Sequence, residues 1–98
     1  MEKIVRDNII QKIRSHWENP QFRQVSWQEK LEFLFKKLVE EAWELQKDKN
    51  LEELADVEEV ILALYAHLGW SREEVQEVRL QKLEKNGGFE EGYILKID

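Results

Sequence analysis

Two acidic motifs are the residues of this sequence best placed to do chemistry. Within residues 40–56, Glu41 and Glu44 precede a short polar break, and Glu53 and Asp56 follow it with the same spacing. Carboxylates three positions apart share one face of a helix. If the two helices pair as an antiparallel hairpin, the motifs lie at matching heights from the turn, and the sequence predicts that the four carboxylates converge.

Two interpretations of this convergence are open. Clustered carboxylates need a counter-charge, because like charges raise one another's pKa. An all-oxygen site with neither His nor Cys nearby selects a hard cation such as Mg²⁺ or Mn²⁺. The alternative is a solvated helical hairpin whose acids pair weakly with surrounding lysines. Those lysines are Lys36, Lys37, Lys47 and Lys49.

A later segment supplies the opposite charge. Arg79, Lys82 and Asn86 share a predicted helix face with Val75 and Val78. Buried cations need anions, so this face is expected either to neutralise the acids or to receive the phosphate oxygens of a ligand. A third interpretation is that these side chains only reach solvent at the rim of the bundle. Lys85 lies at the edge of the same face.

Trp43 is the aromatic residue beside the acidic motif, and it lies off the predicted core stripe. It is placed either to fill a subunit interface, where aromatic residues are enriched, or to stack on a ligand. His16 and His67 show no ligand spacing, so we interpret both as surface or packing residues.

Capping patterns predict the helices that must position these groups. A side-chain acceptor is followed three residues later by Glu in Ser26 with Glu29, Asn50 with Glu53, and Ser71 with Glu74. The predicted helices are 27–47, 51–68 and 72–86, and the first two are joined tightly through 48–50. An N-terminal stripe of Val5, Ile9, Ile13 and Trp17 predicts a shorter helix, capped by Asp7.

The fold class expected is all-α: an antiparallel bundle of about four helices, forming one domain over residues 1–98. Residues 22–25 and 92–97 are candidates for one short β pair. The predicted core positions repeat at helical spacing. They are Leu31, Leu34, Phe35, Leu38, Ala42 and Leu45 in the first long helix, and Leu54, Val57, Ile61, Leu64, Tyr65 and Leu68 in the second.

Composition narrows the possible partners. The chain has 98 residues, 42% of them hydrophobic, and a formal charge of -6. Acidic residues spread along the whole sequence argue against nucleic acid or anionic lipid as a partner. The absence of cysteine rules out thiolate metal sites. With no membrane-length apolar run and no signal-peptide pattern, we expect a cytoplasmic protein, whose thin core would benefit from a partner chain.

The motifs resemble those of a known family. Glu40-Glu41-Ala42-Trp43-Glu44 followed by Glu53-Leu54-Ala55-Asp56 is similar to the EExxE and ExxD motifs of the MazG-like, all-α nucleoside triphosphate pyrophosphohydrolases. Val5-Arg6-Asp7 and the ending from Lys82 to Phe89 look like the short stand-alone members related to phosphoribosyl-ATP pyrophosphohydrolase. The resemblance covers nearly the whole chain.

This resemblance implies a homodimer or homotetramer that hydrolyses nucleoside triphosphates to a monophosphate and pyrophosphate. Carried over by position, it assigns Mg²⁺ to Glu41, Glu44, Glu53 and Asp56. It makes Glu40 a supporting or water-positioning group. It also implies that the ligand is a nucleotide, whose base Trp43 could stack on. Two other functions stay open: a non-catalytic helical dimerisation or regulatory module, and a nucleotide binder without turnover.

Overall fold

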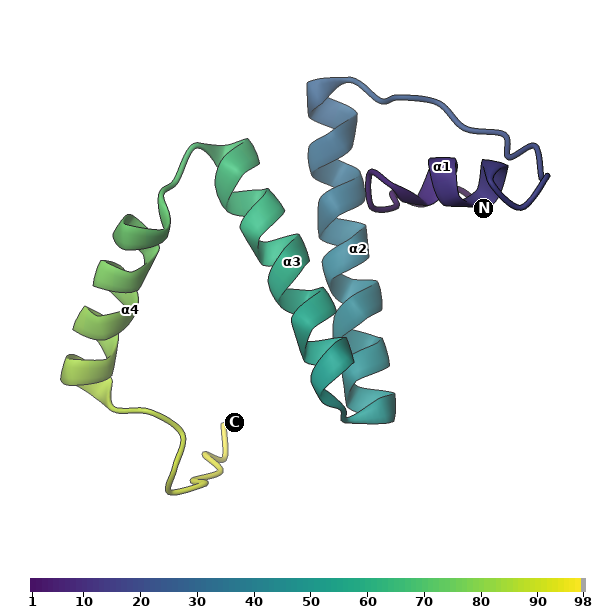
Figure 1. Cartoon of the computed structure of the whole chain (residues 1–98). Coiled ribbons are helices and arrows are strands. Elements are labelled where there is room, and N and C mark those ends of the chain that lie inside the picture. The colour runs from purple at the N-terminus through teal and green to yellow at the C-terminus, as the bar shows by residue number, and fades with distance from the viewer. Residues whose placement is uncertain (98) are drawn as a thin grey trace.

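The computed structural model describes residues 1–97 and contains four helices and no strand in that range (Figure 1). The expected all-α fold class is therefore confirmed. The helices are α1 (Ile9–Arg14), α2 (Trp27–Asp48), α3 (Leu51–Leu68) and α4 (Arg72–Asn86). The three long helices agree with their predicted ranges to within one residue.

Side-chain caps explain this agreement. The backbone N–H groups of Glu29, Glu53 and Glu74 donate to the side chains of Ser26, Asn50 and Ser71, which satisfies donors that the helix itself leaves unpaired. Only at α4 does the Glu side chain also accept from the cap backbone, which completes a capping box among residues 1–97. Gly69, in a left-handed conformation at φ 79°, ends α3.

The α2–α3 hairpin is the packed part of the chain (Figure 1). Leu34, Val60 and Leu64 are its buried residues, and Ile4, Leu31, Leu38 and Ala63 pack against them. Three predicted core positions are wrong, because Phe35, Ala42 and Leu54 are exposed. Phe35 instead begins an apolar stripe on the outer side of α2, and Val60 takes a core position that the periodicity did not single out.

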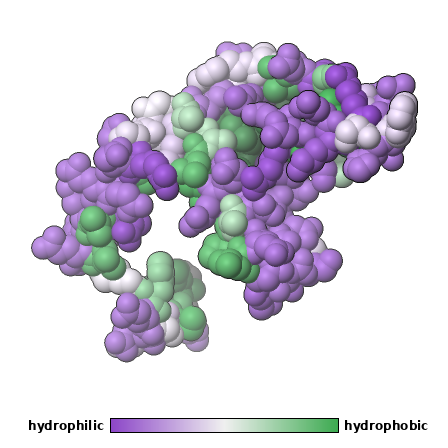
Figure 2. Space-filling model, viewed as in Figure 1, coloured by the Kyte–Doolittle hydropathy of each residue, from purple (hydrophilic) through white to green (hydrophobic). Residues whose placement is uncertain are grey.

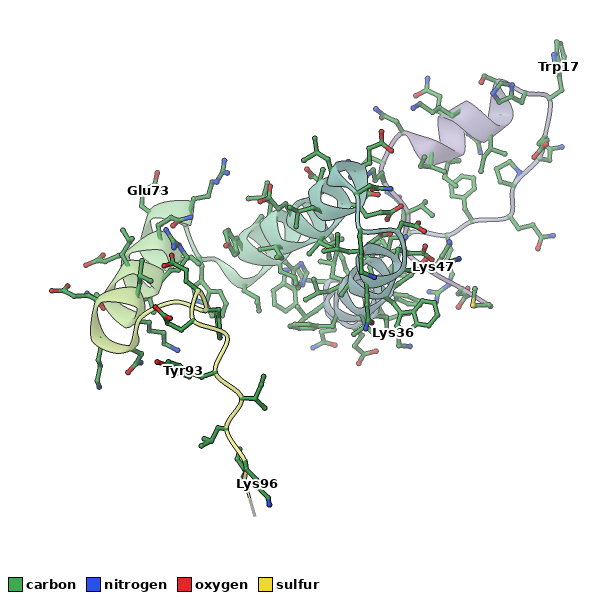
Figure 3. All side chains as sticks on the ribbon, turned by 90° about the horizontal axis from the view of Figure 1, so that it is seen from below. Trp17, Lys36, Lys47, Glu73, Tyr93 and Lys96 are labelled. Atoms are coloured by element: carbon green, nitrogen blue, oxygen red, sulfur yellow. The ribbon has the colours of Figure 1, made fainter. Side chains whose placement is uncertain are left out.

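The N-terminal segment departs from the prediction at both ends of its helix. Helix α1 follows Asn8 without any side-chain cap, so the expected cap by Asp7 is wrong. Trp17 does not continue the apolar stripe: it has φ 63° and is 99% exposed, and its side chain points away from the hairpin (Figure 3). The helix ends too early, at Arg14, for a stripe of that length to form.

Helix α4 lies apart from the hairpin, to one side of α3 (Figure 1). The β pair between 22–25 and 92–97 does not form, and the labelled Tyr93 and Lys96 lie on an extended C-terminal tail (Figure 3). A strand needs a hydrogen-bonding neighbour, and the two segments lie in different parts of the molecule. Gly92, at φ 67°, turns the chain before this tail.

The chain is extended for its length. Its radius of gyration is 17.4 Å, against about 13 Å expected for a compact domain of this size. Figure 2 shows apolar surface in several separate patches on a mainly hydrophilic molecule. Within residues 1–97, none of the helices combines the length and the apolar character needed to cross a membrane.

Candidate metal centre

The acidic motifs are positioned by the shortest connection in the chain. Helix α2 ends at Asp48 and α3 begins at Leu51, so two residues reverse the chain direction. Lys49 adopts the left-handed conformation at φ 51°, and its N–H donates to the carbonyl of Leu45, while Asn50 caps the next helix. This turn places the last turns of α2 beside the first turns of α3.

Five carboxylates gather next to the turn in two overlapping groups. Oxygen atoms of Glu41, Glu53 and Asp56 lie within 4.8 Å of one another, and so do oxygens of Glu44, Asp48 and Glu53. We call Glu41, Glu53 and Asp56 the inner trio, and Glu44, Asp48 and Glu53 the outer trio. The four predicted acids therefore do not form one group: Glu41, Glu53 and Asp56 come together, whereas Glu44 meets only Glu53, in the other group.

The electrostatics of the cluster centre on Glu53. Partial burial raises the pKa of the Glu53 carboxyl, and the negative charges of Asp48, Asp56, Glu44 and Glu41 raise it further. Repulsion of this kind disfavours the ionised form unless a cation compensates it. No salt bridge within residues 1–97 reaches Glu44, Asp48 or Glu53.

Two basic side chains neutralise part of the inner trio. Lys37 Nζ lies 3.2 Å from Glu41 Oε1, one helical turn away, and Arg6 Nη2 donates to Asp56 Oδ1 at 2.8 Å. Lys37 was among the lysines expected to pair with the acids. Arg6 comes from the N-terminal segment, whose course no local sequence pattern predicts.

Glu40, the supporting group implied by the resemblance, is held by lysines from two sides. Lys3 Nζ lies 3.3 Å from one carboxylate oxygen and Lys37 Nζ lies 3.4 Å from the other. Burial alone would raise the pKa of Glu40, but the hydrogen bond from Lys3 and the charges of Lys37 and Lys3 outweigh it and leave the pKa lowered. Glu40 is therefore ionised at neutral pH and better suited to positioning than to accepting a proton.

The predicted cations of α4 do not meet the acids. Arg79, Lys82, Lys85 and Asn86 are exposed, and the side chain of Arg79 donates to Gln76 on its own helix. The expectation that they are buried is wrong, because α4 does not pack on the hairpin. Trp43 is exposed on the outer side of α2, off the core stripe as predicted.

The donor set fits a hard divalent cation. All the ligand atoms are carboxylate oxygens, which Mg²⁺ and Mn²⁺ prefer and zinc or iron sites rarely use alone. Desolvation is the largest cause of the raised pKa of Glu53, and repulsion from the neighbouring acids adds to it, so a cation bound beside Glu53 would relieve part of this repulsion. The residues that would hold the ion are the four predicted acids, with Asp48 in addition.

Sequence reasoning missed Asp48 and Arg6. Asp48 stands four positions after Glu44, a spacing that places both side chains on one helix face, so the signal was present but was assigned to the turn. Arg6 lies fifty positions from Asp56, and no spacing rule reaches that far.

No protein-family model, curated protein or solved structure matches this chain. The resemblance to the MazG-like family stays a prediction that comes from the motifs. The candidate site therefore depends on the geometry of its own residues.

Proposed function

We propose that this chain is a Mg²⁺-dependent nucleoside triphosphate pyrophosphohydrolase. It would cleave the bond between the α and β phosphates and release a nucleoside monophosphate and pyrophosphate. The observation that carries the proposal is the approach of Glu41, Glu53 and Asp56 to within 4.8 Å of one another, at the motif positions of the family that the sequence resembles. A cytoplasmic role in removing unwanted nucleotides is the setting that this activity fits.

The residues divide into three roles. Glu41, Glu44, Glu53 and Asp56 would hold the cation, and the electrostatic support comes from the raised pKa of Glu53. When bound, Mg²⁺ supplies charge neutralisation on the phosphates and lowers the pKa of a coordinated water. Glu40, kept ionised by Lys3 and Lys37, would orient that water through a hydrogen bond.

Substrate contacts are proposed for Arg79, Lys82, Lys85, Asn86 and Trp43. The support is chemical: cations and an amide suit phosphate oxygens, and an indole ring suits a base. Because α4 does not pack on α2 and α3 within the chain, its cations would reach a ligand at the acids only after α4 docks on a hairpin.

Assembly as a homodimer or homotetramer is part of the proposal. Phe35, Val39 and Trp43 are spaced four residues apart along α2 and are 48%, 69% and 65% exposed. We call them the outer stripe. Large apolar residues aligned on one face are typical of an interface, and a second copy of this chain is the partner proposed here.

A non-catalytic helical module is the second candidate. The outer stripe is as compatible with a non-catalytic module as with an enzyme. The separation of α4 from the hairpin favours the module, because the α4 cations do not reach the acids. The two candidates differ in their response to cations. A metal-dependent enzyme gains melting temperature in Mg²⁺ and gains more with nucleotide, whereas a module with solvated acids does not respond.

The direct test is product analysis. A panel of standard and damaged nucleoside triphosphates is incubated with the protein and Mg²⁺, and the released phosphate species is identified. The enzyme yields pyrophosphate rather than orthophosphate, and a binder without turnover yields neither. Glu41→Gln and Asp56→Asn should lower the rate about 100-fold or more. Glu32→Gln, an exposed acid of α2 outside both trios, is the matched control. Parental rates in Glu41→Gln would show that the ligand assignment is wrong.

A further inference from the structure

The N-terminal segment touches the candidate metal centre through one side chain. Arg6 Nη2 donates to Asp56 Oδ1 at 2.8 Å, although the two residues are fifty positions apart. Arg6 and Lys37 are the two basic residues within 1–97 that form salt bridges with the inner trio. Arg6 therefore lies at the edge of the proposed cation site, on the side that faces the N-terminal segment.

The contact is one that the protein can give up. The side chain of Arg6 is 56% exposed and that of Asp56 is 41% exposed, so water solvates both partners. A solvated pair of this kind contributes between zero and about 1 kcal/mol. A divalent cation held by several carboxylates attracts Asp56 more strongly than one guanidinium does.

The chemistry of the freed side chain is specific. A guanidinium presents parallel N–H donors that match the oxygens of a phosphate group. Arg79 and Lys82 cannot take this role within the chain as it folds, because none of the side-chain contacts found in residues 1–97 joins α4 to the acids. Of the two cations in contact with the inner trio, Arg6 has the more exposed side chain, 56% against 17% for Lys37.

We propose that Arg6 is a phosphate-binding residue of this site. It pairs with Asp56 until that carboxylate takes up a divalent cation, and then binds the phosphate chain of the substrate. The inference rests on the proposed function and deepens it, because it assigns the N-terminal segment to the triphosphate subsite.

The proposal predicts two effects of opposite sign. Without Arg6, Asp56 is free to bind Mg²⁺, so the affinity for Mg²⁺ alone should rise. The affinity for a phosphate chain in saturating Mg²⁺ should fall, because one charged contact is lost. A residue that only supports the fold would weaken both affinities together.

The experiment compares the full-length parent with Arg6→Gln and Arg6→Lys. Mg²⁺ affinity is measured without nucleotide, from the dependence of melting temperature on Mg²⁺ concentration. Inorganic triphosphate, which carries the phosphate chain without a base, is then titrated calorimetrically in saturating Mg²⁺. For Arg6→Gln we expect Mg²⁺ binding up to about fivefold tighter and triphosphate binding roughly tenfold weaker. Arg6→Lys should fall between it and the parent.

The matched control is Arg14→Gln, which removes one positive charge from the same part of the chain. Arg14 lies over the ring of Phe22, 4.8 Å from its centroid, and has no salt bridge within residues 1–97. Arg14→Gln should leave both affinities at the parental values. If it raised the affinity for Mg²⁺ as much as Arg6→Gln does, the effect would come from the net charge of the protein and the proposal would be wrong.

The remaining outcomes separate this inference from the function on which it rests. If the parent binds Mg²⁺ and triphosphate and Arg6→Gln changes neither affinity, or lowers both, Arg6 is not a phosphate-binding residue. If the parent binds Mg²⁺ but no triphosphate, the inference fails while the metal centre stands. If the parent does not bind Mg²⁺, the proposed function fails and the inference fails with it.

Discussion

Lys37 and Glu41 form the most buried of the salt bridges in residues 1–97. Their side chains are 17% and 12% exposed, with Nζ and Oε1 separated by 3.2 Å. The pair lies one turn apart on α2, at the inner end of the acidic cluster. A carboxylate with so little solvent around it depends on its partner, so removing the Lys37 ammonium would leave the Glu41 side chain poorly compensated for its lost hydration.

Replacing Lys37 should therefore destabilise the protein, and Mg²⁺ should reverse part of the loss. Lys37→Met keeps the aliphatic stem but leaves Glu41 without its cation, at a cost of about 2 kcal/mol in the free energy of unfolding. Saturating Mg²⁺ should reduce that deficit, because Glu41 regains a positive partner. Urea unfolding with and without Mg²⁺ measures both effects. Lys36→Met, at the exposed neighbouring position, should be near parental, and equal stability of the two variants would contradict the role of the pair.

Neutralising Glu53 should stabilise the protein when no metal is present. Because the folded state raises the pKa of this carboxyl, the folded chain holds its proton more tightly than the unfolded chain does. Stability then falls as the pH rises through the ordinary Glu pKa of about 4.3 and through the raised value above it. Glu53→Gln lacks this loss, so its melting temperature should exceed the parental one at pH 7 in chelator and converge with it below pH 4.

In Mg²⁺, the parent should instead be more stable than Glu53→Gln. The parent gains stability from the ion, while Glu53→Gln has lost the carboxylate shared by both trios. Glu52→Gln, also in the first turn of α3, is the matched control and should respond to Mg²⁺ as the parent does. A Glu53→Gln protein that is less stable than the parent at pH 7 in chelator would mean that the acids do not repel one another.

Asp48 should contribute to Mg²⁺ affinity although no family motif includes it. It belongs to the outer trio with Glu44 and Glu53 and is exposed at the end of α2. Asp48→Asn should weaken Mg²⁺ binding by roughly fivefold, because one solvated charge contact contributes up to about 1 kcal/mol to the binding free energy. The midpoint of the Mg²⁺-dependent rise in melting temperature measures this, with Glu58→Gln of α3 as the control. An unshifted midpoint would confine the ion to the inner trio.

The outer stripe should hold copies of the chain together. Val39→Glu places a charge in the middle of Phe35, Val39 and Trp43, and burying it unpaired is unfavourable. Sedimentation velocity should show the parent as a dimer or tetramer and Val39→Glu as a smaller species at the same concentration. Leu51→Glu, at an even more exposed apolar residue outside the stripe, should assemble as the parent does. A monomeric parent would refute assembly through this surface.

The parts of the structure that the sequence predicts are those determined by neighbouring residues. Ser26, Asn50 and Ser71 mark the starts of the long helices because each cap needs only a backbone N–H three residues away. The convergence of the acids follows for the same reason. Two helices, a short turn and a 3.6-residue period fix the relative positions of Glu41 and Asp56 without help from the rest of the chain.

The parts that escape prediction depend on distant contacts. The capping residue Ser71 predicts that 72–86 is helical. The position of α4 relative to the acids cannot be predicted in this way, because the types and spacing of Arg79 and Lys82 do not determine which element α4 packs against. The pairing of Arg6 with Asp56 depends on how residues 1–8 cross the hairpin. The missing β pair has the same origin, since a strand is stabilised only by a neighbour that other elements bring into place.

The two-residue turn at Lys49 and Asn50 also influences the order in which the molecule assembles. Every carboxylate of the cluster comes from residues 41–56, so the cluster forms through contacts that close only short loops. Short loops close fastest, and local contacts dominate early folding. We therefore expect the acids to meet before the N-terminal segment arrives with Arg6, so that their repulsion opposes an early folding step. If the cluster binds a divalent cation as proposed, that cation should speed the formation of the native state as well as stabilise it.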